Sequence, residues 1–395
     1  MPRGRALIAG GGIAGLAAAL ALRQAGYDVT IFERAGAIEP AGSALSLWPN
    51  AIAALDRLGV GARVRTEAAP IATMVLADRR GGALFGPHPL SSNQAFMVTR
   101  ALLQSTLREA LGAVDLRLGQ PIAQLEQNAD SVAFTLIDGT IARGDIAIVA
   151  DGIWSPTATE LLGNPPRYRG YGGVLALSDP VAGLASTGIA AEYQGDGARF
   201  GVFDIGNRRQ YWFYMHDTPE ADIASLTLGA VAERALHWPA VVRAAIAATP
   251  ADRLLPFAVH ARPAPRRLGH GRVLCVGDAA HAMEPNLGQG ACQALEDAVA
   301  LGSAASIVQP DAMLATYQSL RLARIRAFVR QSSDARHSAH GSLFKQRMAR
   351  AMLRAVPSAI ERRLLALMHD MPAYPLASLS HSRKRMTTPT RGSAL

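Results

Sequence analysis

Cysteine is scarce in this chain of 395 residues, which contains only Cys275 and Cys292. They do not form a Cys-x-x-Cys pair, and no combination of cysteine and histidine has the spacing of a zinc site. No serine, histidine and acid, no reactive cysteine and no pair of carboxylates stands in a pattern typical of hydrolytic enzymes. We therefore expect no disulfide framework and no metal, and the sequence gives no support to nucleophilic hydrolysis.

A long unbroken hydrophobic segment is also lacking. Residues 6–22 carry no charge between Arg5 and Arg23, but the glycines at 10–12 would break an apolar helix near its start. The stretch is shorter than the roughly 20 residues that a membrane span needs, and no small-residue cleavage site follows it. We expect no membrane span, no secretory signal and a cytoplasmic protein.

Acidic residues are rare in one part of the chain only. Residues 332–395 hold 11 of the 40 lysines and arginines but three of the 31 acidic residues, so they account for +8 of the net charge of +9. A basic tail is more often a solvated or helical appendage than a nucleic-acid site, and we predict no nucleic-acid partner. Residues 376–395 are expected to be disordered.

What the sequence does contain is a glycine-rich turn near its start, Gly10-x-Gly12-x-x-Gly15. Residues 6–9 are typical of a buried strand, residues 14–25 of a helix, and residues 29–32 of a second strand that ends at Glu33. Gly10 permits the sharp turn, Gly12 lets the backbone approach a pyrophosphate, and Gly15 lets helix and strand pack closely. Glu33 can accept hydrogen bonds from a ribose. This pattern predicts a dinucleotide site, without choosing between FAD and NAD.

A second ligand-binding pattern spans residues 272–299. Residues 272–276 form a short apolar run typical of a buried strand, and Gly277-Asp278 places an acidic group at its carboxyl end. The segment PNLGQG at 285–290 opens a helix expected over 291–301, so backbone amides and a positive helix end point at one spot. This arrangement favours a ligand with electron-rich oxygen atoms.

Together these patterns resemble the flavin fingerprints of the FAD-dependent aromatic hydroxylases, the single-component class A flavoprotein monooxygenases with the para-hydroxybenzoate hydroxylase fold. The segments GSALSLWPN at 42–50 and DRLGV at 56–60 are similar to the branch that contains salicylate, 6-hydroxynicotinate and urate hydroxylases. The resemblance implies noncovalent FAD, transient NAD(P)H, and transfer of oxygen from O2 to a small aromatic or heteroaromatic substrate through a flavin C(4a)-hydroperoxide. No second GxGxxG unit is present for a permanently held nicotinamide nucleotide.

The resemblance also assigns residues to the cofactor. Arg34 follows the ribose acid near the adenosine part of FAD, Arg100 in MVTRALLQSTL reaches the pyrophosphate and ribityl region, and Asp278 holds the ribityl chain. The full set implied for FAD is Gly10, Gly12, Ala14, Gly15, Glu33, Arg34, Ala44, Arg100, Asp151, Asp278, Gly288 and Gly290.

A third motif matches the family only in part. Asp151, Gly152 and Ser155 resemble the start of D-G-x-x-S-x-x-R, which serves both FAD and the pyridine nucleotide, but Ala158 occupies the arginine position. No residue nearby in the sequence clearly replaces the guanidinium. We expect FAD binding to survive and flavin reduction to be slowed, so that Ala158→Arg would raise the reduction rate.

The order of these patterns predicts an α/β protein with a Rossmann-like FAD-binding domain, an inserted, mainly antiparallel β-sheet substrate domain and a C-terminal helical segment. The FAD-binding domain is expected at residues 1–70, 98–165 and 266–331, the substrate domain at 71–97 and 166–265, and the helices at 332–375. Within the substrate domain we expect a hairpin around 79–82 and a helix over 230–247. The following residues lie at helical spacing and are expected to pack inward: Leu343, Phe344, Met348, Ala351, Met352 and Ala355.

By resemblance to the urate-hydroxylase-like members, Arg199 and Tyr211 lie against the substrate. We predict that Tyr211 hydrogen-bonds the substrate and helps to remove its proton, and that Arg199 stabilises the anion. The alternative is a sheet tyrosine and a solvent-facing charge. Pro285 is expected to present its carbonyl near flavin and substrate, which makes Tyr211, Arg199 and Pro285 the catalytic candidates. The substrate-binding candidates are Leu45, Leu47, Tyr211, Phe213 and Asn286. His281 and His260 are possible bases, but we expect both to be packing residues.

For Arg199 and Tyr211 to contact the same substrate, the hairpin that joins residues 198–204 to 210–216 must place both side chains on one face. Side chains alternate along a strand, so Tyr211 and Arg199 share a face only if residues 206–208 form a three-residue loop, with Ile205 opposite Arg209. A loop of two residues would put them on opposite faces. Gly206 or Asn207 can supply the positive φ that the longer loop needs, and we choose that register.

Two other functions stay open. One is an epoxidase or reductase of the same fold with a larger apolar substrate, and the other is a flavin-holding interaction protein whose basic tail recruits a membrane or nucleic acid. Homodimer and monomer both remain possible.

Overall fold

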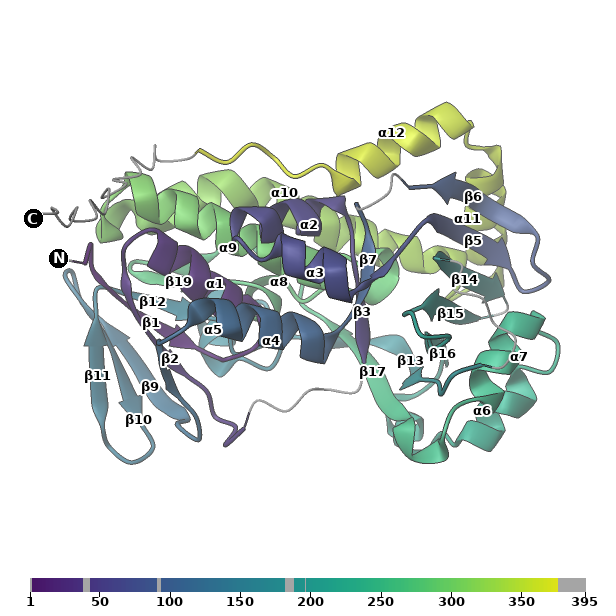
Figure 1. Cartoon of the computed structure of the whole chain (residues 1–395), viewed down its shortest axis with the longest axis horizontal. Helices are drawn as coiled ribbons and strands as arrows, with labels where there is room; N and C mark the ends of the chain where they lie inside the picture. Colours follow the sequence, from purple (N-terminus) through teal and green to yellow (C-terminus); the bar gives the residue numbers. More distant parts are fainter. Residues whose placement is uncertain (1, 38–42, 91–93, 182–187, 196, 376–395) are drawn as a thin grey trace, which may run out of the picture.

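The computed structural model describes residues 2–37, 43–90, 94–181, 188–195 and 197–375. The expected disordered tail at 376–395 lies outside the described residues. A parallel sheet with its helices forms one side of the molecule and a second large sheet the other, and the long helices α9 (Gly290–Ile307) and α10 (Met313–Ala335) run lengthwise along the first side (Figure 1). Among the described residues, no helix is long and apolar enough to cross a membrane.

The first sheet has the strand order β18-β19-β12-β1-β2-β8, and only the β18–β19 pair is antiparallel. After β1 the chain turns at Gly10, where φ is 104°, enters α1 and returns as β2 beside β1. The predicted strand, turn, helix and strand are therefore confirmed. The elements are β1 (Arg5–Ala9), α1 (Ile13–Gln24), β2 (Asp28–Phe32), β8 (Asp115–Arg117), β12 (Ile146–Val149), β18 (Gly269–His270) and β19 (Val273–Cys275).

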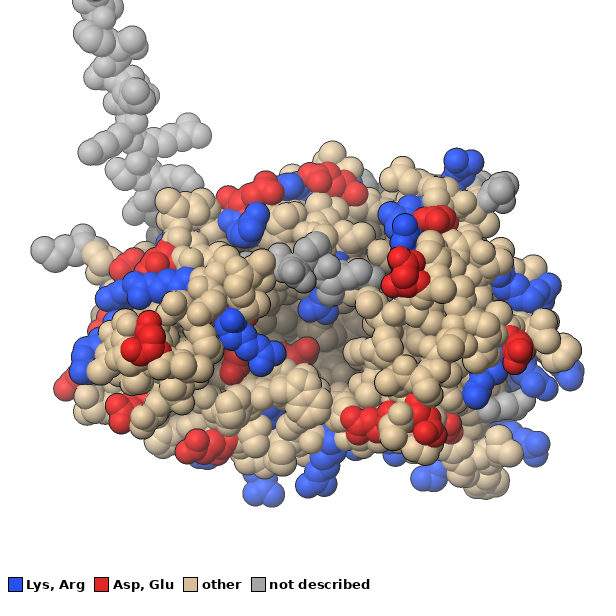
Figure 2. Space-filling model, turned by 90° about the horizontal axis from the view of Figure 1, so that it is seen from below, with Lys and Arg blue, Asp and Glu red and all other residues tan. Residues whose placement is uncertain are grey.

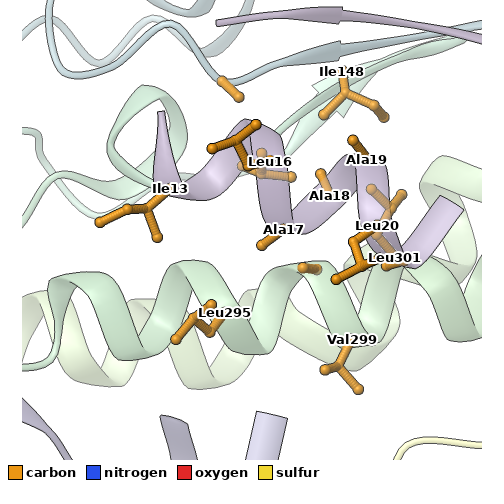
Figure 3. Packing of buried hydrophobic residues seen from close by; sticks show 14 of the residues in the cluster. Ile13, Leu16, Ala17, Ala18, Ala19, Leu20, Ile148, Leu295, Val299 and Leu301 are labelled. Atoms are coloured by element: carbon orange, nitrogen blue, oxygen red, sulfur yellow. The ribbon is translucent and has the colours of Figure 1, made fainter. Parts of the chain in front are cut away.

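Small side chains bring α1 close to α9. Alanines fill the inner side of α1, and a Cβ atom on Gly302 would lie only 3.0 Å from the Cβ of Ala21. Figure 3 shows Leu16, Ala17 and Leu20 of α1 above Leu295 and Val299 of α9. Because each helix starts at one of the two fingerprints, this packing fixes the fingerprints relative to each other.

The second large sheet has the order β17-β13-β16-β15-β14-β5-β6. It is mainly antiparallel, as expected, with one parallel pair between β14 and β5. The hairpin predicted around residues 79–82 is formed by β5 and β6. The elements are β5 (Thr73–Asp78), β6 (Ala83–Pro89), β13 (Arg167–Leu177), β14 (Ile189–Gly195), β15 (Ala198–Asp204), β16 (Gln210–Asp217) and β17 (Leu255–Ala261).

The predicted register of β15 and β16 is confirmed. Asp204 pairs with Gln210, and the Ile205 amide donates to the Arg209 carbonyl at 3.1 Å, so residues 206–208 form the loop. All three loop residues have positive φ, including Arg208 at 59°.

Smaller elements complete the α/β fold. β9 (Ile122–Gln127), β10 (Val132–Leu136) and β11 (Ile141–Gly144) form one antiparallel sheet, and β3 (Ala44–Leu47), β4 (Ala69–Pro70) and β7 (Phe96–Thr99) form another. The shorter helices of this half are α2 (Pro49–Arg57), α3 (Gly61–Glu67), α4 (Arg100–Leu111), α5 (Pro156–Leu162) and α8 (Asp278–His281). The domain boundaries stay a prediction, and the one expected at residue 97 would fall inside β7.

Two expectations about helices are wrong. The single helix over 230–247 is instead α6 (Leu228–Arg234) and α7 (Ala240–Ala247), because Pro239 lacks an amide hydrogen and disfavours helical backbone before it. Several apolar residues of α11 (Leu343–Ala355) were expected to pack inward, yet Phe344 is 71% and Met352 66% exposed. The buried side of α11 contains Gln346, and the apolar stripe faces outward. The next helix is α12 (Ser358–His369).

Candidate active site

A cavity of about 1220 Å³ lies between the two large sheets. Figure 2 shows the molecule hollowed between its two halves. The cavity extends from the two fingerprints, past β15 and β16, to α10, α11 and α12. The predicted site residues that line it are Gly12, Ala14, Ala44, Leu45, Arg100, Arg199, Tyr211, Phe213, Asp278, Pro285, Asn286, Gly288 and Gly290.

Six predicted residues do not line the cavity: Gly10, Gly15, Glu33, Arg34, Asp151 and Leu47. Gly15 is required for backbone packing, since a Cβ there would lie 1.9 Å from the Gly10 carbonyl oxygen. Leu47 was expected to contact substrate, which is wrong. It is the last residue of β3 and is fully buried in the hydrophobic core, so its side chain stabilises the fold instead.

The fingerprint region fits FAD. No heavy atom lies within 4 Å of a Cβ built on Gly12 or Gly290, so both helix starts face open space where phosphate or flavin oxygens can approach the amides. Glu33 accepts from the amides of Gly11 at 2.7 Å and Ala35 at 2.9 Å. Each carboxylate oxygen keeps a lone pair for a ribose hydroxyl.

A buried charged network holds Asp278 in place. Asp297 accepts from the amide of Gly277 at 2.9 Å, pairs with His281 Nε2 at 2.6 Å, and accepts from Arg321 Nε at 2.8 Å. Burial disfavours the carboxylate, but His281 and Arg321 outweigh it and lower the pKa of Asp297 to about 2. Asp297 of α9 thus fixes the turn at Gly277, which positions Asp278.

Both histidines considered as bases are packing residues. His281 is fully buried against Asp297. His260 lies 3.2 Å from Glu220 and its ring meets the edge of Trp154 at 4.7 Å. Neither lines the cavity.

No residue nearby in the sequence replaces the arginine that the third motif lacks, but a distant arginine contacts the same loop in the fold. Arg262 is buried, and its Nη2 donates to the carbonyls of Ile153 at 2.6 Å and Ser155 at 3.1 Å. Ser155 caps α5 through the amide of Ala158 at 3.0 Å. Arg262 therefore holds the loop that follows Asp151 in place, from a position 109 residues after Ile153.

Asp151, at the start of the loop that Arg262 holds, has a carboxylate oxygen without a hydrogen-bond partner among the described residues. Burial raises the pKa of Asp151, and its Oδ1 has no hydrogen-bond partner among the described residues. The neighbouring Ala150 and Gly152 line the cavity. A buried carboxylate oxygen without a partner is the kind of group that a cofactor hydroxyl would satisfy.

The cavity wall formed by β15 and β16 is aromatic. Phe203 pairs with Tyr211, and their ring centroids are 5.9 Å apart. A Cβ on Gly201 would lie 2.2 Å from Phe213, so the glycine makes room for that ring. Phe203 was missed, although the register that puts Arg199 and Tyr211 on one face of the sheet also puts Phe203 directly opposite Tyr211.

Polar groups with unused hydrogen-bonding capacity lie on the same wall. Arg199 is 2% exposed, and its Nη1 meets Glu192 only at 3.4 Å, while its Nε has no partner among the described residues. Gln194 donates to Glu192 at 2.6 Å, and its own buried Oε1 is likewise unsatisfied. Because β14 carries Glu192 and Gln194 next to β15, this cluster depends on a sheet order that local sequence patterns do not reveal. A polar ligand would satisfy these atoms.

The amide of Asn286 is largely engaged by the protein. Its Oδ1 accepts from Tyr171 Oη at 3.1 Å and its Nδ2 donates to the Ser332 carbonyl at 2.7 Å. Tyr171 Oη also lies 2.9 Å from Glu284 Oε2, so its one hydroxyl proton is shared between the two acceptors. The carbonyl of Pro285 accepts from the Gly288 amide at 3.2 Å. Asn286 and Pro285 thus shape the cavity floor, and the carbonyl of Pro285 has one lone pair left.

This fold and site define a flavoprotein oxidoreductase, and the comparison with known proteins gives its family. The family described as FAD binding domain matches residues 4–332. The chain belongs to this family, which confirms the resemblance to the FAD-dependent aromatic hydroxylases and confirms FAD as its cofactor.

Known relatives cover most of the chain. It is 35% identical over 339 residues to the aurachin C monooxygenase/isomerase of Stigmatella aurantiaca, a match that spans 82% of this chain and 86% of that protein. It is 32% identical over 356 residues to an FAD-dependent urate hydroxylase of Klebsiella pneumoniae, a match that spans 85% of this chain and 91% of that protein. The crystal structure of Klebsiella pneumoniae HpxO complexed with FAD and uric acid superposes with a TM-score of 0.81 at 28% identity, covering 93% of this chain and 96% of that one.

Proposed function

We propose that this protein uses NAD(P)H and O2 to hydroxylate a small aromatic or heteroaromatic substrate. When bound, FAD would supply the redox chemistry, passing two electrons from NAD(P)H to O2 so that one oxygen atom would enter the ring and the other would leave as water. The observation that carries this proposal is the wall of β15 and β16, where aromatic rings and a buried arginine face a cavity that is continuous with the FAD fingerprints.

In this proposal Arg199 stabilises negative charge on the substrate. Its guanidinium is buried, lies 5.2 Å from the centroid of Phe213, and is only weakly paired with Glu192. In such a site a cation strongly favours an anionic ring substituent, which raises the electron density of the ring. Arg199 therefore favours loss of the substrate proton.

Tyr211 is proposed to orient the substrate by a hydrogen bond. Burial raises the pKa of Tyr211, and the nearby charges of Arg199 and Arg100 offset only part of this effect. The hydroxyl is thus neutral and is a poor proton acceptor on its own. Its hydroxyl has no hydrogen-bond partner among the described residues, so it is free to bind a ring substituent.

An epoxidase with a larger apolar substrate is the second candidate. The cavity continues beyond Tyr211 along α10 to apolar residues of α11 and α12 and of the link between them, including Leu353, Val356 and Met368. That extension offers more apolar wall than a small aromatic acid needs.

Oxidation of NAD(P)H by the purified, FAD-loaded protein separates these functions. We expect aromatic acids or heterocycles to accelerate the oxidation, with one oxygen atom added to the ring. Acceleration only by long apolar alkenes, with an epoxide as product, would favour the second candidate. The proposed setting is the cytoplasm, where NAD(P)H is available.

A further inference from the structure

Helices α11 and α12 carry a concentration of exposed apolar side chains. Seven of the fifteen large hydrophobic residues that are exposed in the described chain fall between 343 and 367. They form what we term the α11–α12 face: Leu343, Phe344, Met348, Met352, Ile360, Leu364 and Leu367. Leaving so many large apolar groups in water is unfavourable, and such patches mark interaction sites.

Basic residues accompany this face. Lys345, Arg347, Arg362 and Arg363 lie on the same two helices, and none has an acidic partner among the described residues. The only acid within these helices, Glu361, is buried and pairs with His88 at 3.0 Å. Four basic side chains without an acidic partner in the described chain therefore lie on the two helices that carry the apolar stripe.

This combination decides between possible partners. A second copy of the chain would bring two positive surfaces together, which is unfavourable. The segment 376–395 cannot neutralise the face either, because its sequence contains four basic residues and no acid. An anionic lipid bilayer provides both an apolar interior for Phe344 and Met352 and negative headgroups for the arginines.

The cavity reaches this face. Met352, Leu364 and Leu367 are all more than 45% exposed, and the same three residues line the cavity. The residues behind them, Leu353 and Met368, continue the apolar lining inward. A molecule dissolved in the bilayer would thus meet an apolar entrance.

We propose that the α11–α12 face docks on an anionic lipid bilayer. Insertion of Phe344, Met352 and Leu367 supplies the apolar contact, and Lys345, Arg347, Arg362 and Arg363 contact the headgroups. Uptake of a lipophilic substrate through the adjacent entrance is a consequence that rests on the second candidate function, the epoxidase with a larger apolar substrate. Docking itself does not depend on catalysis.

Flotation of the FAD-loaded protein with vesicles tests this proposal, without NAD(P)H or substrate. We expect binding to vesicles of equal phosphatidylglycerol and phosphatidylcholine, weaker binding at high salt, and no binding to phosphatidylcholine alone. Phe344→Ser should weaken binding about tenfold or more, while Ile137→Ser, which alters an equally exposed residue at 71%, should not. Arg362→Glu with Arg363→Glu should abolish binding, while Arg266→Glu with Arg267→Glu should leave it unchanged.

Failure to float with anionic vesicles would overturn the proposal. Equal losses in the matched control variants would also overturn it, because binding would then reflect general charge or apolarity. Light scattering supplies a further check: a dimer that is lost in Phe344→Ser, together with no vesicle binding, would show that the face is an interface between copies. Since no turnover is measured, failure of the proposed hydroxylation would not alter these outcomes.

Discussion

Arg199 and Tyr211 lie on the same face of the seven-stranded sheet, because Met215 pairs with Arg199 and Phe203 pairs with Tyr211 across β15 and β16. The three-residue loop at 206–208 sets this relationship, since a register shifted by one residue would turn one of the two side chains to the opposite face. A short turn thus determines whether the cavity contains both a cation and a phenol.

Tyr211→Phe is expected to weaken substrate binding about tenfold and to leave FAD content unchanged, because it removes one hydrogen bond from a buried site. Substrate titration of the flavin absorbance would measure this. Tyr193→Phe is a matched control, since Tyr193 packs against the opposite cluster of the same sheet. Equal effects of the two changes would contradict the role of Tyr211.

Asp278→Ala should weaken FAD binding about tenfold or more, since it removes charge-assisted hydrogen bonds worth roughly 1.5 to 3 kcal/mol. Equilibrium dialysis of the apoprotein with FAD gives the dissociation constant. The exposed Asp252 provides the control variant Asp252→Ala, which should bind FAD normally. If Asp278→Ala retained wild-type affinity, the second fingerprint would have lost its assigned role.

Ala158→Arg is now expected to destabilise the protein instead of restoring flavin reduction. Ala158 is fully buried, and the guanidinium of Arg262 already contacts the adjoining loop, so a second arginine would be buried without a partner. We expect a loss of about 3 kcal/mol or more in the free energy of unfolding. Chemical denaturation measures it, with Glu160→Arg on the exposed side of α5 as the control. A stable Ala158→Arg protein with faster flavin reduction would refute this expectation.

Acidification should destabilise the docking of α12 through His369. Its ring stacks on Trp48 with centroids 5.0 Å apart, and burial lowers the pKa of His369 from 6.5 to about 4. Between these values the unfolded chain binds more protons at His369 than the folded chain does. The contribution of His369 to the free energy of unfolding is therefore fully present above pH 6.5 and declines as the pH falls toward 4. The loss between pH 7 and pH 5 should be about 2 kcal/mol.

Urea unfolding at the two pH values measures this loss. His369→Phe should remove that part of the pH dependence, whereas His237→Phe, at an exposed position, should not. An unchanged pH profile in His369→Phe would show that other groups control the acid response.

The parts of the site that could be predicted from the sequence are those encoded locally. The turn at Gly10, the acid at Asp278 and the loop at 206–208 depend on residues close together in the chain, so spacing and alternation locate them. Arg262 could not be found this way, because it follows β17 in the sequence and meets the loop after Asp151 only in the folded protein. Glu192 and Gln194 could not be predicted either, because they reach Arg199 only through the order of the strands in the folded sheet.

The helix errors have different physical origins. Pro239 gave a local signal for the break between α6 and α7, which the periodicity of the surrounding alanines concealed. The apolar stripe of α11 is real, but periodicity shows only that a helix has an apolar side, not whether the protein covers that side. The exposure of Phe344 and Met352 could therefore be learned only from the structure.

Incorporation of oxygen from O2 tests the proposed hydroxylation most directly. The FAD-loaded protein would be given NAD(P)H, 18O2 and a panel of aromatic acids and heterocycles, with the products analysed by mass spectrometry. We predict a hydroxylated ring that carries one 18O atom, formed with consumption of NAD(P)H and at a reduced rate in Tyr211→Phe. NAD(P)H oxidation without any labelled product, or a product whose oxygen comes from water, would contradict a monooxygenase.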